Sequence, residues 1–290
     1  MDDALQPHSN GPIEIRSLEL DVTTADEHRF QLIARIPAAP HASLLWLPAM
    51  GIGAKHYVPF ADALAQRGIA VFLHEWRGAG SSSIRADRAT DWGYRELLTL
   101  DIPASEAVIA QQLPDVPRIL GGHSLGGQLA CCRVGLSPES AQRLWLVGSG
   151  APYWRAFPAR TAWWLPMVYR FLPWLADFHG VLPGRRIGFG GQEARSVIRD
   201  WSLTGLSGRY AAAGVDVDLE SAMAALTLDA HAVVLARDWL GPVSSLRFLM
   251  SKLRRVEPRI DVLDATALGT RADHYAWMKQ PAAVADALVR

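Results

Sequence analysis

Cysteine is almost absent from this sequence. Its 290 residues include only two cysteines, Cys131 and Cys132, which are adjacent in a stretch with helical spacing. Two neighbouring cysteines cannot form a disulfide framework, and no group of His, Cys and carboxylate residues has metal-ligand spacing. We therefore predict that both thiols are small buried hydrophobic groups and that the chain has no metal site. This cysteine usage fits a reducing compartment.

An excess of one charge sign is also missing. Lysine plus arginine and aspartate plus glutamate each number 29, so the formal net charge is zero. This balance does not indicate a broad basic face for nucleic acid or anionic lipid. No Gly-Lys-Ser/Thr loop occurs, and "GIGAKH" at 51–56 lacks the third glycine of a dinucleotide loop. We expect no nucleic-acid partner and no cofactor.

Long hydrophobic runs are absent as well. The apolar stretch 162–175 is too short to span a bilayer, and it contains Pro166, Arg170 and Pro173. The first residues, "MDDALQPHSNGP", have neither the basic nor the apolar region of a signal peptide. We expect a cytoplasmic protein without stable membrane insertion. The composition leaves its oligomeric state open.

The sequence does contain an alternation of short apolar strands and amphipathic helices. The chain is 50% hydrophobic and long enough for one large domain with a sizeable core. Extended segments at 14–22 and 29–36 predict an antiparallel pair. Strands that are apolar throughout and separated by helices indicate the α/β class, with a mainly parallel sheet covered on both faces. These strands are predicted at 43–47, 70–75, 118–120, 143–147, 232–236 and 259–263, and the helices at 56–67, 97–112, 124–135, 242–254 and 281–289.

One aromatic-rich segment interrupts this alternation. It includes "YWRAFPARTAWWLPMVYRFLPWLADFHG" and shows no clear strand and helix pair. We predict a helical cap over a site, which divides the chain into core (1–150), cap insertion (151–228) and core (229–290). Trp163 and Trp164 are candidate substrate-binding residues, of which we expect at least one to line the pocket. We expect Trp174 to lie in the core of the cap.

A serine between glycines marks the candidate catalytic centre. Gly122 to Gly126 reads Gly-His-Ser-Leu-Gly, between the apolar strand "RIL" and a helical stretch. Glycines two residues before and two after the serine allow a sharp turn that exposes the hydroxyl. The helix that follows directs its N-terminus toward this hydroxyl. The context favours Ser124 as a nucleophile over a serine that only caps a helix.

A nucleophilic serine needs a base, which should follow it in the chain. Three histidines occur beyond Ser124. His274 follows the last predicted strand, where the loop would reach the carboxyl edge of the sheet. His179 lies in the inserted segment and His231 precedes a strand at the opposite edge. We therefore choose His274 as the base.

The base needs an acid to orient it, and two aspartates compete for this role. Asp238 follows the strand at 232–236 and begins a loop on the same sheet edge as the base. Asp264, just past the last strand, is the alternative. Asp261 lies within a strand, and Asp273 is too close in sequence to His274 to support its ring easily. We favour Asp238 and keep Asp264 open.

An anionic tetrahedral intermediate needs two backbone donors for its oxygen. The N–H of Leu125, directly after the serine, is one candidate. The other should come from the glycine-rich loop "PAMGIGAKHY" after the strand at 43–47. We choose the N–H of Met50 from this loop.

With these residues in place, the chain from Ile13 onward resembles an α/β-hydrolase. It is most similar to the branch that contains serine aminopeptidases and monoglyceride lipases, and within it to bacterial predicted hydrolases. Two positions depart from the usual pattern, because Pro48 replaces a histidine and Glu75 an aspartate. The matching stretches are the oxyanion loop Pro48 to Gly51, the stretch Glu75 to Ser81, the nucleophile elbow Gly122 to Gly126, the acid Asp238 and the base His274.

These residues together predict a serine hydrolase that forms an acyl-enzyme. The aromatic cap favours small-molecule esters with hydrophobic acyl groups as substrates. Two alternatives stay open: an acyltransferase that uses the same residues, and a noncatalytic binding module on the hydrolase fold. The sequence leaves the physiological substrate and the acyl chain length undetermined.

Overall fold

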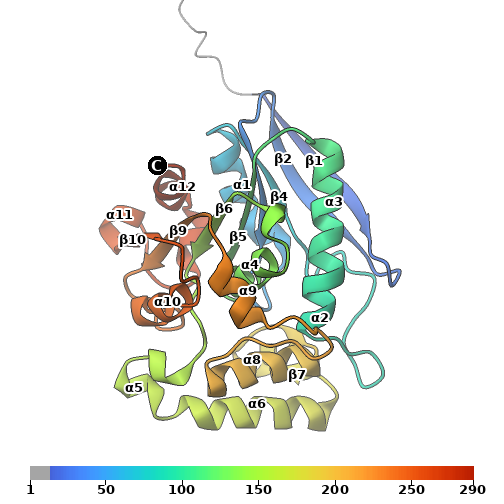
Figure 1. Cartoon of the computed structure of the whole chain (residues 1–290), viewed down its shortest axis with the longest axis vertical. Coiled ribbons are helices and arrows are strands. Elements are labelled where there is room, and N and C mark those ends of the chain that lie inside the picture. Colours follow the sequence, from blue (N-terminus) through green and yellow to red (C-terminus); the bar gives the residue numbers. More distant parts are fainter. Residues whose placement is uncertain (1–13) are drawn as a thin grey trace, which may run out of the picture.

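In a computed structural model of the chain, which describes residues 14–290, an eight-stranded sheet forms the middle layer (Figure 1). The strand order is β1-β2-β4-β3-β5-β6-β9-β10. The expectation about a signal peptide concerns residues that lie outside the described range. The strands are β1 (Ile15–Thr23), β2 (Arg29–Pro37), β3 (Ala42–Leu47), β4 (Ile69–Leu73), β5 (Arg118–His123), β6 (Arg143–Val147), β9 (Asp229–Leu235) and β10 (Arg259–Leu263).

Pairing within the sheet confirms the predicted class. β1 and β2 form an antiparallel pair, in which Ile15 lies opposite Pro37, and β2 is antiparallel to β4. Every pair from β4 through β10 is parallel. The carboxyl ends of these strands therefore meet at one edge, where loops of distant sequence come together.

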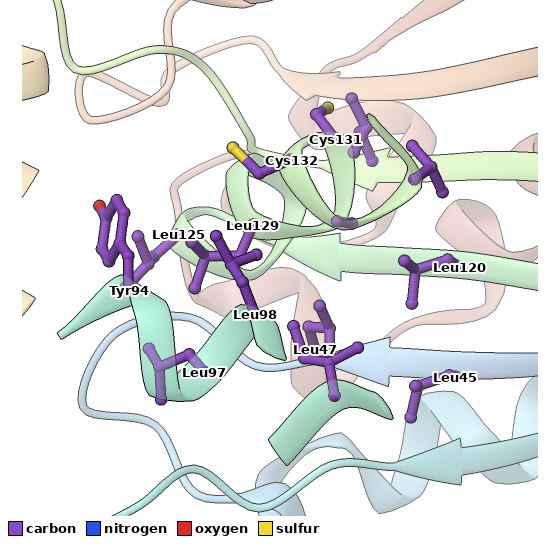
Figure 2. Packing of buried hydrophobic residues seen from close by; sticks show 14 of the residues in the cluster. Leu45, Leu47, Tyr94, Leu97, Leu98, Leu120, Leu125, Leu129, Cys131 and Cys132 are labelled. Atoms are coloured by element: carbon purple, nitrogen blue, oxygen red, sulfur yellow. The ribbon is translucent and has the colours of Figure 1, made fainter. Parts of the chain in front are cut away.

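Both faces of the sheet are buried, and β3 shows why its sequence is apolar throughout. Leu45 and Leu47 pack into one core, whereas Leu44 and Trp46 pack into the other, because successive side chains point to opposite faces. Figure 2 shows the first core. Leucines from β3 and β5 meet Leu97 and Leu98 and the leucines of the helix Leu125–Leu136 there. The helices of the core are α1 (Val58–Ala65), α2 (Tyr94–Glu96), α3 (Ile102–Gln112), α4 (Leu125–Leu136), α10 (Val243–Met250), α11 (Ala265–Leu268) and α12 (Ala282–Val289).

The two cysteines lie on α4 within this first core (Figure 2). Both are fully buried and free. Burial raises the pKa of the Cys131 thiol to about 12, and that of Cys132 well above its usual value. The prediction that they act as small hydrophobic groups is confirmed.

The segment between β6 and β9 forms a separate layer beyond the carboxyl edge of the sheet (Figure 1). A two-stranded hairpin, β7 with β8, interrupts its helices, which the sequence did not indicate. The last helix of the segment packs on α4 of the core, where Met223 approaches Gly135. The layer beyond the sheet edge therefore ends before this last helix. The elements are α5 (Ala159–Ala162), α6 (Leu165–His179), β7 (Leu182–Pro183), α7 (Gly184–Ile187), β8 (Gln192–Glu193), α8 (Arg195–Ser207) and α9 (Leu219–Ala225).

No helix within residues 14–290 has the length and apolar character needed to cross a membrane.

Candidate active site

Ser124 stands in the turn between β5 and α4, with backbone angles that few residues adopt. Its φ is 54° and its ψ is −118°. A non-glycine residue in such a region costs about 1–3 kcal/mol, which the surrounding structure must supply. The Ser124 N–H donates to the Val147 carbonyl on the neighbouring strand at 3.1 Å, which helps to hold the turn. The turn therefore fixes the serine at the carboxyl edge of the sheet.

The glycines around Ser124 are required by close packing of the backbone. A Cβ on Gly122 would lie 2.3 Å from the carbonyl carbon of Gly126. A Cβ on Gly126 would lie 2.0 Å from the carbonyl oxygen of Leu47. A larger residue at Gly122 would collide with the start of α4, and one at Gly126 would push this helix start away from β3.

His274 and Asp238 meet at the same edge of the sheet. The Nδ1 atom of His274 lies 2.6 Å from Oδ2 of Asp238, and both side chains are buried. The other carboxylate oxygen, Oδ1, accepts the N–H groups of Leu240 and Gly241 at 2.9 and 3.0 Å. These two backbone donors fix the carboxylate, which in turn fixes the imidazole ring with Nε2 free to act on a partner.

The competing residues have other contacts in the structure. Asp264 caps α11 by accepting the Ala267 N–H at 2.8 Å. Asp261 bonds to His231 at 2.8 Å, and the other nitrogen of that ring lies 3.2 Å from the Leu288 carbonyl. Asp273 accepts the N–H groups of the two residues that follow His274. His179 is exposed at the end of α6, away from these groups.

The two predicted oxyanion donors line the same cavity as Ser124. Met50 is nearly buried and Leu125 begins α4. Within residues 14–290, neither backbone N–H donates a hydrogen bond to another protein group, so both remain available to a ligand. Gly51, directly after Met50, has φ of +74°, and a Cβ there would lie 2.2 Å from the Gly191 nitrogen of the cap. The loop thus depends on glycine both for its conformation and for contact with the cap.

Two side chains that sequence reasoning missed hold the predicted oxyanion loop. The Tyr57 hydroxyl accepts the Ala49 N–H at 2.9 Å. The Trp76 indole N–H donates to the Pro48 carbonyl at 2.9 Å. These bonds brace the loop although Pro48 has no side chain that can do so. Glu75, the other departure from the family pattern, accepts the Ala54 N–H at 3.1 Å, just beyond the loop.

Tyr57 also links this loop to His123, the residue before the nucleophile. Its hydroxyl lies 2.8 Å from Nδ1 of His123. The same hydroxyl oxygen therefore bonds both the Ala49 N–H and the His123 ring. Burial lowers the pKa of His123 well below its usual value. A neutral ring therefore packs against His274, with the ring centroids 4.5 Å apart. The contacts among Tyr57, His123 and His274 follow only from the fold, because no spacing in the sequence relates these residues.

A cavity of about 600 Å³ lies between the sheet edge and the cap. Its lining includes Ser124, His274, Met50 and Leu125 from the core. From the cap and the nearby loops, its apolar lining residues are Phe157, Trp164, Leu165, Val168, Tyr169, Phe171, Leu172, Ile187, Phe189, Trp201, Trp239 and Leu240.

The three tryptophans considered from sequence have different positions. Trp164 lines the cavity, with its ring 6.2 Å from that of Trp239. Trp163 is 70% exposed and does not line it, so of the two candidates only Trp164 lies at the cavity, and the placement of Trp163 there is wrong. The prediction that Trp174 lies in the cap core is also wrong, because its side chain is 59% exposed.

Solved structures of hydrolases share this fold. A hydrolase from Pseudomonas aeruginosa PA01 is 17% identical, with a TM-score of 0.57, and the match covers 93% of this chain and 97% of that one. An esterase from Exiguobacterium antarcticum is 14% identical, with a TM-score of 0.60 and coverage of 94% and 98%. An esterase from Pyrococcus furiosus is 16% identical, with a TM-score of 0.59 and coverage of 96% and 90%.

Comparison by sequence gives the family. No curated protein matches this chain. A family model described as serine aminopeptidase, S33, matches residues 38–200, which is more than half of the chain. This stretch contains the turn at Ser124 and the predicted oxyanion loop. The chain therefore belongs to the serine aminopeptidase S33 family of α/β-hydrolases.

Proposed function

We propose that this hydrolase is a serine esterase that acts through an acyl-enzyme on carboxylic esters with hydrophobic acyl groups. One observation carries the proposal. The strained Ser124 and the Asp238-bound His274 face one cavity, together with two backbone N–H groups that have no protein acceptor among residues 14–290. Strain at a serine, an oriented base and unused donors in one place are features of acyl transfer.

Each group has a defined part in the first half of the reaction. The Ser124 Oγ attacks the ester carbonyl carbon while its proton passes to Nε2 of His274. The carbonyl oxygen becomes an anion, which accepts hydrogen bonds from the Met50 and Leu125 N–H groups. Asp238 stabilises the imidazolium without taking its proton. Collapse of the intermediate breaks the C–O bond to the alcohol, which receives the proton from His274.

The second half repeats these steps with water. His274 removes a proton from water, the resulting hydroxide attacks the acyl-serine, and the same two N–H groups stabilise the new oxyanion. The C–O bond to Ser124 then breaks, and the serine oxygen regains a proton from His274. The products are a carboxylic acid and the free enzyme.

The chemistry of the cavity favours an apolar acyl group. Its lining contains no lysine, arginine, aspartate or glutamate side chain. A charged acyl group would lose its hydration there without gaining an ion partner. An aliphatic chain would instead bury apolar area against the aromatic and aliphatic residues of the cap, at about 25 cal/mol per Å².

A screen of activated esters with graded acyl chains tests this function. We expect turnover of at least one of them, with loss of about three orders of magnitude or more in kcat in Ser124→Ala. A fluorophosphonate probe should label the wild type and leave Ser124→Ala unlabelled. Equal rates in the two proteins, or no labelling of Ser124, would contradict the mechanism and favour a binding module. Acyl transfer to an added alcohol or amine that outpaces hydrolysis would reassign the protein as an acyltransferase.

A further inference from the structure

Helix α6 has two apolar faces, only one of which is covered. The inner face, which includes Leu165, Tyr169 and Leu172, is buried over the cavity and packs toward α8. The outer face consists of Met167, Phe171, Trp174 and Phe178, which together with Trp163 at the end of α5 we call the outer stripe. Successive members are three or four residues apart, so they lie on one side of the helix. Trp163 belongs to the stripe because it also has helical backbone angles.

The outer stripe is a row of exposed apolar side chains. Its five side chains are 50–70% exposed. The Phe171 and Trp174 ring centroids are 5.6 Å apart, and those of Trp174 and Phe178 are 5.9 Å apart with nearly parallel planes. Figure 1 shows α6 as the edge of the molecule, with α8 between it and the sheet. Five large apolar side chains held together on an outer helix mark an interaction surface.

The stripe is connected to the active-site cavity. Phe171 belongs to both the stripe and the cavity lining. Ile187, Trp239 and Tyr275 also line the cavity while remaining more than 40% exposed. An apolar molecule that moved from a partner bound at the stripe toward Ser124 would therefore contact apolar side chains along its path.

The sequence segment that carries the stripe is rich in arginine, although the chain as a whole is neutral. Residues 151–190 contain a single acidic side chain, Asp177, and its carboxylate pairs with Arg199 at 3.0 Å. The same segment has five arginines, all exposed, and within residues 14–290 none of them forms an ion pair. These arginines are Arg155, Arg160, Arg170, Arg185 and Arg186.

This combination identifies the occupant of the surface. Tryptophan and phenylalanine rings flanked by arginines are typical of helices that lie in the headgroup region of a membrane. A second copy of the chain fits poorly, since two such faces would bring their unpaired arginines together. The stripe and its arginines therefore fit a surface that is apolar and negatively charged.

We propose that the outer stripe and its arginines dock this protein on anionic lipid surfaces, with α6 lying in the plane of the interface. The docked protein would receive its substrate directly from the lipid layer through the Phe171 end of the cavity. This docking is peripheral and needs no spanning helix. The docking itself is independent of the proposed esterase reaction.

The test measures binding of full-length Ser124→Ala protein to vesicles, so that no lipid is hydrolysed. We expect sedimentation with phosphatidylcholine vesicles that contain phosphatidylglycerol, and much weaker sedimentation with phosphatidylcholine alone or at high salt. Adding Trp174→Ala and Phe178→Ala should reduce binding by about tenfold or more. Arg160→Gln and Arg170→Gln should each reduce it by about fivefold.

Matched controls remove similar groups elsewhere. Val217→Ala removes an exposed apolar side chain outside the stripe, and Arg16→Gln removes an exposed arginine on β1. Both should bind like the parent protein. In the active enzyme, Trp174→Ala with Phe178→Ala should leave hydrolysis of a short, dissolved ester unchanged, which also shows that the variant folds.

Two results would overturn the docking proposal. One is that the parent protein fails to bind anionic vesicles, or that the stripe variants bind them as well as the parent protein does. The other is a dimer in solution that Trp174→Ala with Phe178→Ala converts to monomer without any vesicle binding, which would assign the stripe to a second copy. Because binding is measured without turnover, a negative screen of esters would leave this result standing, and the reverse also holds.

Discussion

Asp238 is the residue whose role can be tested most sharply. Its Oδ1 accepts two backbone N–H groups, so the Oδ2 side faces His274. In Asp238→Asn, the amide oxygen would keep the two backbone donors, and the NH2 group would donate to Nδ1. The ring proton would then sit on Nε2, which could no longer accept the serine proton. We expect kcat to fall by about 10³ to 10⁴ with the fold intact.

Asp264→Asn is the matched control for this prediction. Asparagine caps a helix as well as aspartate does, so the start of α11 should be preserved. Its kcat should change by about tenfold or less in the same ester assay. A larger loss in Asp264→Asn than in Asp238→Asn would reassign the acid.

Positions that follow from chain order could be predicted from the sequence, whereas contacts between residues far apart in the chain could not. Ser124 and Asp238 follow the carboxyl ends of predicted strands, and His274 lies in the loop region beyond the last strand, which is enough to place them at one edge of a parallel sheet. Tyr57 lies within a stretch predicted to be helical and has no special spacing. Its bonds to Ala49 and His123 arise only when the first helix packs against the nucleophile turn.

At the scale of the element, α6 shows what periodicity leaves open. Its apolar residues repeat on two opposite sides, and the pattern alone cannot say which side is covered. We expected Trp174 inside the cap because large aromatic rings are usually buried, but the smaller inner face, with Leu172 and Ala176, packs instead. Proline at 173 does not end the helix, which continues to His179.

Trp164 provides a test of how the cap selects its substrate. Its ring lines the cavity beside Trp239, so Trp164→Ala should enlarge the acyl site. We expect the ratio of kcat/KM for long to short acyl esters to rise by about tenfold or more. Trp163→Ala is the adjacent control, and its chain-length profile should match the wild type because the ring is outside the cavity. An unchanged profile in a folded Trp164→Ala protein would show that this wall does not select the acyl chain.

For the whole molecule, the sheet was predictable and the arrangement of the cap was not. Strands buried on both faces occur in the sequence as continuous apolar runs, and the core helices separate these runs. The cap lacks such a repeat, because short helices, a hairpin and long turns pack irregularly on the sheet edge. Its last helix, α9, packs on α4 of the core, although the boundary predicted from the sequence falls after this helix.

One buried carboxylate joins this cap to the core. Asp200 on α8 accepts the Tyr94 N–H at the start of α2, at 2.8 Å. Burial raises the pKa of its carboxyl from 3.8 to about 6. Between these two values the folded protein holds a proton that the unfolded chain has released. The free energy of unfolding should therefore fall as pH rises through this window, by about 3 kcal/mol at most, and stay level above it.

Asp200→Asn should remove this dependence while keeping the link between α8 and α2. The amide oxygen can still accept the Tyr94 N–H, and no charge is buried. At about pH 7.5 the variant should be more stable than the wild type by about 2 kcal/mol in urea unfolding, and the difference should shrink as pH falls toward about 4.5. Asp177→Asn on α6 is the control, because its exposed pair with Arg199 should contribute at most about 1 kcal/mol at either pH. A stability difference between Asp200→Asn and wild type that stays constant with pH would show that this carboxylate is not the group that titrates between cap and core.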